Sequence, residues 1–252
     1  FLYMNLVKRA VIVILHPKTY GAQQVVVLNE FNVSYRMDFF PTTDDFIRSV
    51  VVNEFQLTPY AFNLGIHGAK NADYYQIIGA RQIVSENYLK DSVEILESKP
   101  EIWCVGVAVE NVFLNEEGKM IAKAMGTSFG MGLGNFRTLN ESGFVDTVGT
   151  PMYPSWVFEK IGYFDEELVR NQDDEHNLRI HRGGGRVWQS ATIQSTYHPR
   201  ASVSDVFRQY RQYGYWKPFV MKKHGQAAAL RHLVPGLFVA ALMLAALLAV
   251  PR

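Results

Sequence analysis

The sequence contains only one cysteine, Cys104, so an internal disulfide framework is excluded and a reducing compartment is indicated. Cys104 stands in the apolar run WCVGVAV, where a buried, unreactive thiol is expected. The seven histidines show none of the paired spacings of a metal site. Repeats and low-complexity linkers are also absent. With 252 residues, 48% hydrophobic and 19% charged, the chain suits one sizeable globular domain or one domain with an appendage.

Acidic residues are scarce toward the C-terminus. After Glu175 the only acid is Asp205, whereas eleven Lys and Arg residues follow Glu175, although the net charge of the whole chain is +1. The segment 233–250, LVPGLFVAALMLAALLAV, carries no charge and has no polar face. It just reaches the roughly 20 residues that a membrane span needs, which favours membrane insertion over a buried core helix.

Basic residues precede this apolar segment, and positive flanks stay in the cytoplasm. We therefore expect a globular part that faces the cytoplasm, held at an inner (cytoplasmic) membrane. Because the sequence stops two residues after the apolar segment, we expect a fragment of a longer membrane protein.

Apolar runs and helix signals alternate along the first half of the chain. We expect strands at 10–15, 32–37, 74–78 and 103–109, and helices at 58–70, 85–96 and 154–162. Ser85 is the expected N-cap of the second helix. The alternation predicts the α/β class, with a mainly parallel sheet covered by helices on both faces. Sites in such sheets lie at the carboxyl ends of the strands.

Three adjacent acids, Asp173, Asp174 and Glu175, open a predicted helix in the run RNQDDEHNLRIHRGGG. Successive helical residues turn by about 100°, so the three carboxylates cannot all face one site. Glu175 stands four residues before Arg179 and can pair with it along the helix. Acids in a first turn are also favoured by the partial charge of the helix N-terminus, which offers a purely structural explanation.

The ordered run GTPMYPSWVFEKIGYFDEELVRNQDDEHNLRIHRGGGRVWQ resembles the acceptor half of family 2 glycosyltransferases, inverting enzymes with a GT-A fold. The family's Glu-Asp motif reads Gln172-Asp173 here. Further on, RQYRQYGYWK is similar to the family's Gln-x-x-Arg-Trp motif, with Tyr215 in place of Arg. The resemblance covers residues 55–250 and points to membrane-bound bacterial exopolysaccharide transferases of the succinoglycan type.

This resemblance implies a hexosyltransferase type of enzyme that moves a sugar from a nucleotide-diphosphate sugar to a lipid-linked or growing saccharide acceptor, with inversion. It implies Asp173 as the catalytic base, and we expect this carboxylate to stay ionised at neutral pH because it lies at a helix N-terminus. The implied acceptor-binding residues are Gln172, Asp174, Gln212 and Trp216. The implied nucleotide-sugar-binding residues are Pro17, Asp38, Asn63, Gly79 and Arg81.

The family's metal-binding Asp-x-Asp motif should follow the strand at 74–78, where the sequence reads Gly79, Ala80, Arg81. Both carboxylates are therefore missing. Two explanations stay open for the charge of the leaving diphosphate, which Mg²⁺ or Mn²⁺ normally neutralises. Either Arg81 takes over part of that charge, or acids elsewhere, such as Asp44 and Asp45, help to hold the metal.

We expect three segments: a GT-A glycosyltransferase domain over 1–200, in which 1–55 is divergent or shortened; an amphipathic membrane-interface helix in 201–232; and the start of a transmembrane region over 233–252. Trp216 would stack on a sugar or join an interfacial aromatic belt. The expected partners are the donor, the acceptor and the membrane, and no nucleic acid. The alternative is a catalytically silent, membrane-anchored GT-A module that binds sugar or a protein partner.

Overall fold

The computed structural model of the chain describes residues 10–16, 23–28, 48–52, 57–68, 72–79, 82–85, 87–112, 115–125, 127, 141–197, 202–225 and 233–249. Up to residue 52 it describes the backbone alone. The expected strand at 32–37 lies outside the described residues. The same holds for six residues named in the site predictions, which are Pro17, Asp38, Asp44, Asp45, Ala80 and Arg81.

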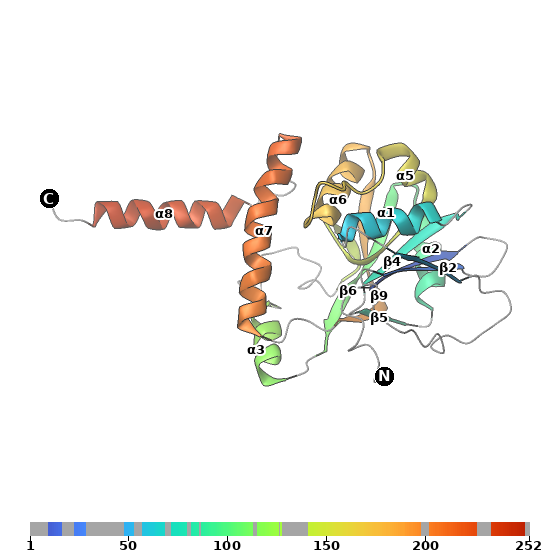
Figure 1. The fold of residues 1–252 in the computed structure, drawn as a ribbon, viewed down its shortest axis with the longest axis horizontal. Helices are drawn as coiled ribbons and strands as arrows, with labels where there is room; N and C mark the ends of the chain where they lie inside the picture. The colour runs from blue at the N-terminus through green and yellow to red at the C-terminus, as the bar shows by residue number, and fades with distance from the viewer. Residues whose placement is uncertain are drawn as a thin grey trace.

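The described strands form one sheet, and helices flank it (Figure 1). The strands are β1 (Ala10–His16), β2 (Gln23–Leu28), β3 (Arg48–Val52), β4 (Tyr74–Gly79), β5 (Gln82–Val84), β6 (Ile102–Asn111), β7 (Gly143–Val145), β8 (Gly149–Pro154) and β9 (Arg186–Tyr197). The helices are α1 (Thr58–Gly68), α2 (Tyr88–Ser98), α3 (Glu116–Met125), α5 (Ser155–Ile161), α6 (Gln172–Arg182), α7 (Val203–His224) and α8 (Val234–Leu248). The strand order is β3-β2-β1-β4-β8-β6-β9-β5, and β7 pairs with β9.

The sheet is mixed, so the prediction of a mainly parallel sheet is wrong. Strand β2 is parallel to β3 and β6 is parallel to β9, whereas the other pairs among the described strands are antiparallel. Only residues 17–22 separate β1 from β2. A parallel crossover needs about a dozen residues or more, so this short link enforces an antiparallel pair. The predicted α/β class itself is confirmed.

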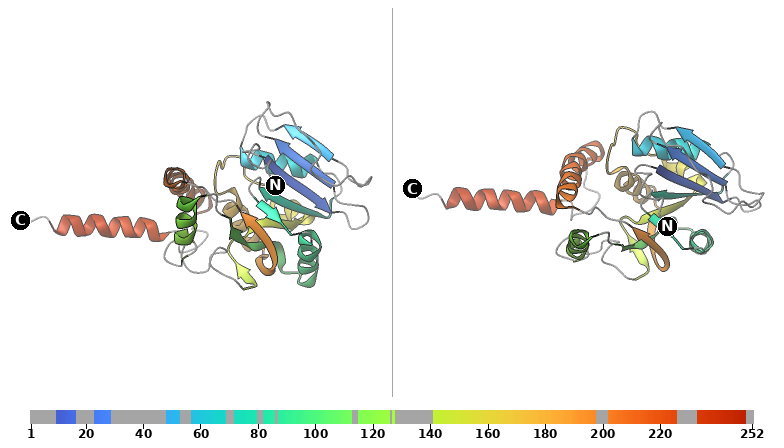
Figure 2. Two further views of the ribbon diagram at one scale, coloured as in Figure 1. Left: turned by 90° about the horizontal axis from the view of Figure 1, so that it is seen from below. Right: turned by 60° about the horizontal axis from the view of Figure 1, so that its bottom comes forward.

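Apolar side chains of the central strands alternate between the two faces of the sheet. Tyr75 and Tyr153 belong to a core cluster with side chains of α1, α5 and α6. Their neighbours in sequence, Tyr74 and Met152, belong to a second cluster with Leu96 of α2. Successive residues of a strand point to opposite faces, so each strand contributes to both clusters. The prediction of helices on both faces is confirmed (Figure 2).

The predicted helices at 58–70, 85–96 and 154–162 are present as α1, α2 and α5. The predicted cap at Ser85 is wrong, because the residue that precedes α2 is Asn87, whose side chain makes no capping hydrogen bond. Ser85 instead contributes its backbone carbonyl, which accepts from the amide of Tyr88 at 3.1 Å.

The three glycines after α6 form a tight turn against an indole ring. A Cβ atom would lie 2.8 Å from Trp103 if placed on Gly183 and 2.1 Å if placed on Gly185. Gly184 has a φ of 90°, which side chains rarely adopt. The ring of Trp103 meets that of Trp156 edge-on, with centroids 5.1 Å apart. The glycine run therefore brings the end of α6 close to the start of β6.

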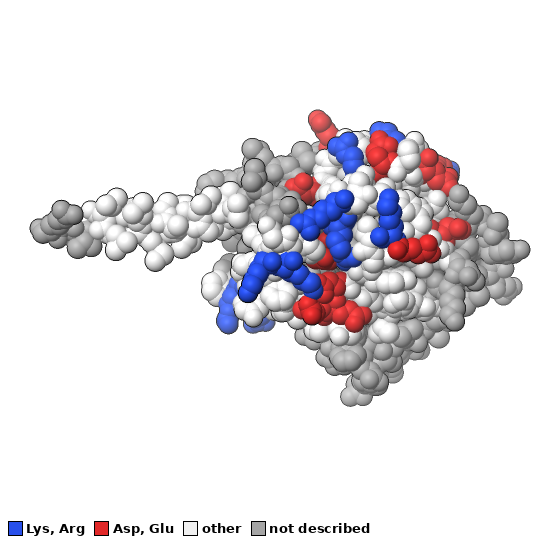
Figure 3. All heavy atoms as spheres, turned by 90° about the horizontal axis from the view of Figure 1, so that it is seen from above, with Lys and Arg blue, Asp and Glu red and all other residues white. Residues whose placement is uncertain are grey.

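Helix α7 lies against the side of the domain, and α8 projects away from it (Figures 1 and 2). No residue of α8 is buried. In Figure 3, acidic and basic side chains lie next to one another on the domain, whereas α8 shows neither. Among the helices that the structure describes, none combines the length and the apolar content needed to cross a bilayer.

Candidate functional site

The start of α6 lies at the edge of the sheet where β4 and β6 end. Halfway along α6, Asn177 donates to the hydroxyl of Thr147 at 3.0 Å, just before β8 begins. The other end of α6 meets Trp103 at the start of β6. Strand β8 is antiparallel to both β4 and β6, so β8 begins where they end. Asp173 and Gly79 therefore lie toward the carboxyl ends of β4 and β6, the edge at which sites were predicted.

Glu175, the last of the three acids, is a buried structural residue. It is 2% exposed, and its two oxygens accept from Arg179 at 2.8 Å each, which confirms the predicted pair. His224 of α7 contacts the same carboxylate, with Nε2 2.9 Å from Oε1. Arg179 also donates to the carbonyl of Tyr163 at 2.7 Å. Glu175 thus joins α6 to the loop after α5 and to the end of α7.

Asp174 is paired with a cation from α7. Its Oδ2 atom accepts from the ammonium group of Lys217. The side-chain amide of Asn171 donates to the same oxygen at 2.9 Å. Asn171 adopts a left-handed conformation, with a φ of 65°, immediately before the helix begins. An acceptor sugar would have to compete with Lys217 for this carboxylate, and the predicted acceptor contact of Asp174 stays a prediction.

Asp173 differs from its two neighbours. Its Oδ1 accepts a hydrogen bond from the backbone amide of Asp174 at 2.9 Å. No cation among the described residues forms an ion pair with Asp173, whereas Asp174 and Glu175 each have one. The side chain is accessible to solvent by its surface area. A substrate can therefore reach this carboxylate from solution. The three adjacent acids therefore have separate contacts.

The surroundings of Asp173 raise its pKa to about 6. The main cause is desolvation by the surrounding protein, the second is the charge of Asp174, and Lys217 acts in the opposite direction. We expected this carboxylate to be ionised at neutral pH, and a pKa of about 6 is consistent with that expectation. At pH 7 the carboxylate is still mostly ionised, and its pKa is close to the pH at which a general base works best.

His176, three residues after Asp173, is a core residue rather than a second base. It is fully buried and stacks on Phe164, with ring centroids 4.5 Å apart. Burial, followed by the charge of Arg179, lowers the pKa of His176 to about 3. The imidazole therefore stays neutral over the pH range in which Asp173 titrates.

The inner face of α7 lies against the acidic segment. The side-chain oxygen of Gln212 accepts a hydrogen bond from Nε of Arg170 at 2.9 Å. Arg170 stands two residues before Gln172. Gln172 itself is buried, and its Oε1 has no hydrogen-bond partner among the described residues. Trp216 is partly buried and meets Tyr215 edge-on, with ring centroids 5.3 Å apart. The structure therefore brings the two sequence motifs together, but it does not test acceptor binding by Gln172, Gln212 or Trp216.

The end of α7 adds further contacts that the sequence did not reveal. Lys223 pairs with Asp165 and with Glu167, both at 2.6 Å. Arg182 donates to the backbone carbonyl of His224 at 2.8 Å. The hydrogen bonds that the Lys223 ammonium group donates to Asp165 and Glu167 raise the pKa of Lys223. Basic residues read from the sequence as a positive membrane flank are thus partly used to hold α7 on the domain.

Asn63, a predicted nucleotide-sugar residue, is buried in α1. Its side-chain amide donates to the carbonyl of Phe164 at 2.9 Å and to Glu166 at 2.8 Å, and its oxygen accepts from the amide of Phe164 at 3.0 Å. A contact with a nucleotide sugar would require these hydrogen bonds to break.

Gly79 ends β4, as predicted, and its amide donates to the side chain of Gln82 at 2.8 Å. The described part of the chain contains no group of three or more His, Cys, Asp or Glu side chains that could hold a metal ion. Gly79 offers no side-chain ligand. The alternative ligands named from the sequence, Asp44 and Asp45, lie outside the described residues.

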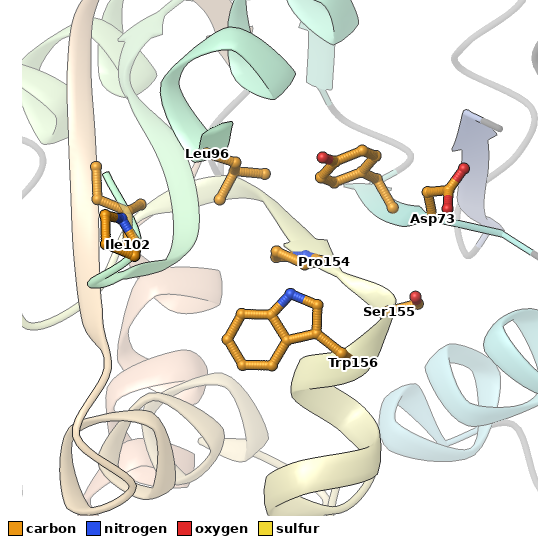
Figure 4. A pocket seen from close by; sticks show the side chains of 8 residues that line it. Asp73, Leu96, Ile102, Pro154, Ser155 and Trp156 are labelled. Carbon is orange, nitrogen blue, oxygen red and sulfur yellow. The ribbon is translucent and has the colours of Figure 1, made fainter. Parts of the chain in front are cut away.

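A surface hollow lies at the opposite edge of the sheet (Figure 4). Its lining includes Asp73, Leu96, Ile102, Pro154 and Trp156. These residues surround the beginnings of β4 and β6, whereas Asp173 lies toward their ends. None of the predicted site residues lines this hollow.

The comparisons with known proteins relate the chain to glycosyltransferases. No family model matches the sequence. The chain is 30% identical over 179 residues to the dolichyl N-acetyl-alpha-D-glucosaminyl phosphate 3-beta-D-2,3-diacetamido-2,3-dideoxy-beta-D-glucuronosyltransferase of Methanococcus voltae, with 69% of this chain and 55% of that protein covered. It is also 30% identical over 146 residues to the succinoglycan biosynthesis protein ExoA of Rhizobium meliloti strain 1021, with 58% of this chain and 44% of that protein covered.

These two matches confirm the resemblance to succinoglycan-type glycosyltransferases. The chain spans about half the length of these curated relatives. Among solved structures, GalNAc-T7 with UDP, GalNAc and Mn²⁺ has a TM-score of 0.47 and 14% identity, covering 63% of this chain and 33% of that one. TarS 1–349 of S. aureus has a TM-score of 0.42 and 12% identity, covering 62% and 44%.

Proposed function

We propose that the chain is the catalytic part of a glycosyltransferase with a GT-A arrangement that acts in polysaccharide biosynthesis. It moves a sugar from a nucleotide-sugar donor to a lipid-linked or growing saccharide acceptor. The observation that carries this proposal is Asp173, a solvent-accessible carboxylate with a pKa of about 6 at the edge of the sheet. The relationship to a named glucuronosyltransferase supports the same reaction class, and its name supports a lipid-linked acceptor.

In the proposed reaction, Asp173 removes the proton from an acceptor hydroxyl while the hydroxyl oxygen attacks the anomeric carbon of the donor sugar. The new carbon–oxygen bond forms on the face opposite the bond to the nucleoside diphosphate. That bond breaks, and its electron pair leaves with the diphosphate. The anomeric configuration is therefore inverted. Asp173 is suited to the role of base because it is accessible and because a pKa near the working pH favours proton transfer in both directions.

The donor is proposed to bind at the carboxyl end of β4. Gly79 lies at the edge where the donor would bind, and the other donor contacts are predicted at Pro17, Asp38 and Arg81. A bound Mg²⁺ or Mn²⁺ would neutralise the charge of the leaving diphosphate, and Asp44 and Asp45, which could help to hold it, lie outside the described residues.

We further propose that the protein works at the cytoplasmic face of an inner membrane. The outer face of α7 supports this because Phe207 is 70% exposed and Tyr215 is 71% exposed. Arg208 and Arg211 are exposed on the same helix. Exposed aromatic and basic side chains on one helix face are typical of segments that bind a lipid surface. Helix α8 carries no charged residue, and none of its residues is buried.

The test is a transfer and hydrolysis assay of the full-length protein in detergent, with several nucleotide sugars as donors. We expect transfer with at least one donor, and loss of transfer in Asp173→Asn. The matched control is Glu94→Gln, which changes an exposed acid of α2 that pairs only loosely with Lys90, at 3.8 Å. A protein that binds donors but neither transfers nor hydrolyses them would instead support the catalytically silent module.

A further inference from the structure

Helix α7 brings a cation to the carboxylate next to the proposed base. The ammonium group of Lys217 contacts Oδ2 of Asp174, and the two side chains are only 20% and 16% exposed. Asn171 donates to the same oxygen at 2.9 Å. Two donors from different elements therefore hold Asp174 in place, and one of them neutralises its charge.

Asp174 is in turn connected to Asp173. The backbone amide of Asp174 donates to Oδ1 of Asp173 at 2.9 Å, so the two carboxylates are close neighbours. A negative charge on one carboxylate disfavours ionisation of the other. Among the described residues, the charged groups that act on Asp173 are Asp174 on its own helix and Lys217 on α7. Lys217 is the cation in this set.

We propose that Lys217 is a positioning residue for sugar transfer: by neutralising Asp174, it leaves Asp173 as the ionised carboxylate that accepts the proton of the acceptor. This inference rests on the proposed function. Lys217 contacts Asp174 directly, and its charge also lowers the pKa of Asp173. Because Lys217 is carried by α7, the docking of α7 becomes a condition for activity at neutral pH.

The first test is the pH dependence of transfer in charge variants of the full-length protein. In Lys217→Met the acid limb of the profile should move upward by about one pH unit, and transfer at pH 7 should fall about twofold. Lys217→Arg keeps the charge and should keep the wild-type midpoint. In Asp174→Asn the limb should move downward, since Lys217 would then act on Asp173 without a partner. The double variant Lys217→Met with Asp174→Asn should return toward the wild-type midpoint.

A second readout does not depend on transfer. Protein labelled with ¹³C at the aspartate carboxyl groups is titrated by NMR, with the signal of Asp173 assigned from Asp173→Asn. The midpoint should rise in Lys217→Met and fall in Asp174→Asn. Lys90→Met removes an exposed cation from α2 and should leave the midpoint unchanged.

The two readouts separate the possible failures. Transfer by the wild type together with an unchanged Asp173 titration in Lys217→Met would overturn the inference and leave the proposed function standing. No transfer with any donor would contradict the proposed function, and a shifted titration would then support only the electrostatic coupling of Lys217 to Asp173. A merely structural role of Lys217 would produce unfolding or uniform loss of transfer, without midpoint shifts of opposite sign in the two single variants.

Discussion

The two faces of helix α7 use similar residue types in opposite ways. On the inner face, Lys217 and His224 contact acids of α6, with Asp174 and Glu175 as their partners. On the outer face, aromatic side chains such as Phe207 are exposed beside Arg208 and Arg211. The comparison teaches that a basic, aromatic helix does not define a membrane surface by composition alone. Cations that neutralise acids of the domain are not available to lipid.

We expect the largest effect at Asp173, which lies near the inner face of α7 and forms no ion pair with a described cation. Asp173→Asn removes the base but keeps the shape of the side chain, so we expect transfer to fall by at least about 100-fold. Transfer assays measure the loss, and circular dichroism checks that the fold is retained. Near wild-type transfer by a folded Asp173→Asn protein would rule out the proposed base.

The next effect concerns the stability of the inner face. Glu175→Ala leaves Arg179 and His224 without their shared carboxylate, and breaking a buried ion pair costs about 3–5 kcal/mol. Denaturant unfolding of the two proteins measures the difference. Glu94→Ala removes an exposed partner of Lys90 and should change the unfolding free energy by less than about 1 kcal/mol. Equal losses of unfolding free energy in Glu175→Ala and Glu94→Ala would contradict a stabilising role for the buried contacts of Glu175 with Arg179 and His224.

On the outer face we expect an effect on membrane binding and none on the fold. Phe207→Ser combined with Tyr215→Ser should weaken binding to vesicles of anionic lipid by about tenfold or more, because two exposed aromatic side chains are lost. Flotation with vesicles measures the binding. Met120→Ser, an exposed apolar residue of α3, serves as the control. If the double variant floats as well as the wild type, α7 does not contact the lipid through this face.

We expect the smallest effect, on the unfolding free energy, from Lys223 at the C-terminal end of α7. Lys223 is 37% exposed at its side chain and pairs with Asp165 and Glu167. Exposed ion pairs contribute about 0–1 kcal/mol, so Lys223→Met should change the unfolding free energy by no more than that. The difference should shrink further at high salt, which screens exposed charges. A large, salt-independent loss would mean that Lys223 is as important to docking as Glu175.

Much of the fold could be predicted from local patterns. The helices α1, α5 and α6 follow from capping residues, apolar spacing and a glycine stop, and the pair of Glu175 with Arg179 follows from helical spacing. The parallel character of the sheet was predicted wrongly, because no strand was expected at 23–28 and the antiparallel pair of β1 and β2 was therefore missed. The short interval of residues 17–22 was the available signal.

The candidate site was predicted less completely, for a physical reason. The helical position of Asp173 is a local property, and the sequence indicates it. The pKa of Asp173 depends on protein atoms and charges brought together by folding, including Lys217 from α7. Asn63 and Gln212 likewise form hydrogen bonds with residues far away in the sequence, Phe164 and Arg170. Local sequence patterns do not indicate such contacts.

If Asp173 is the base of the sugar transfer, kcat/KM must depend on pH in a specific way. A base works only when it has lost its proton, so the rate should fall as the pH drops through the pKa of Asp173. With a donor that the full-length protein accepts, we expect an acid limb with a midpoint near pH 6. In Asp173→Asn that limb should be absent from the small residual rate. A wild-type rate that stays level from pH 7 to well below pH 6, or an unchanged acid limb in Asp173→Asn, would contradict the account.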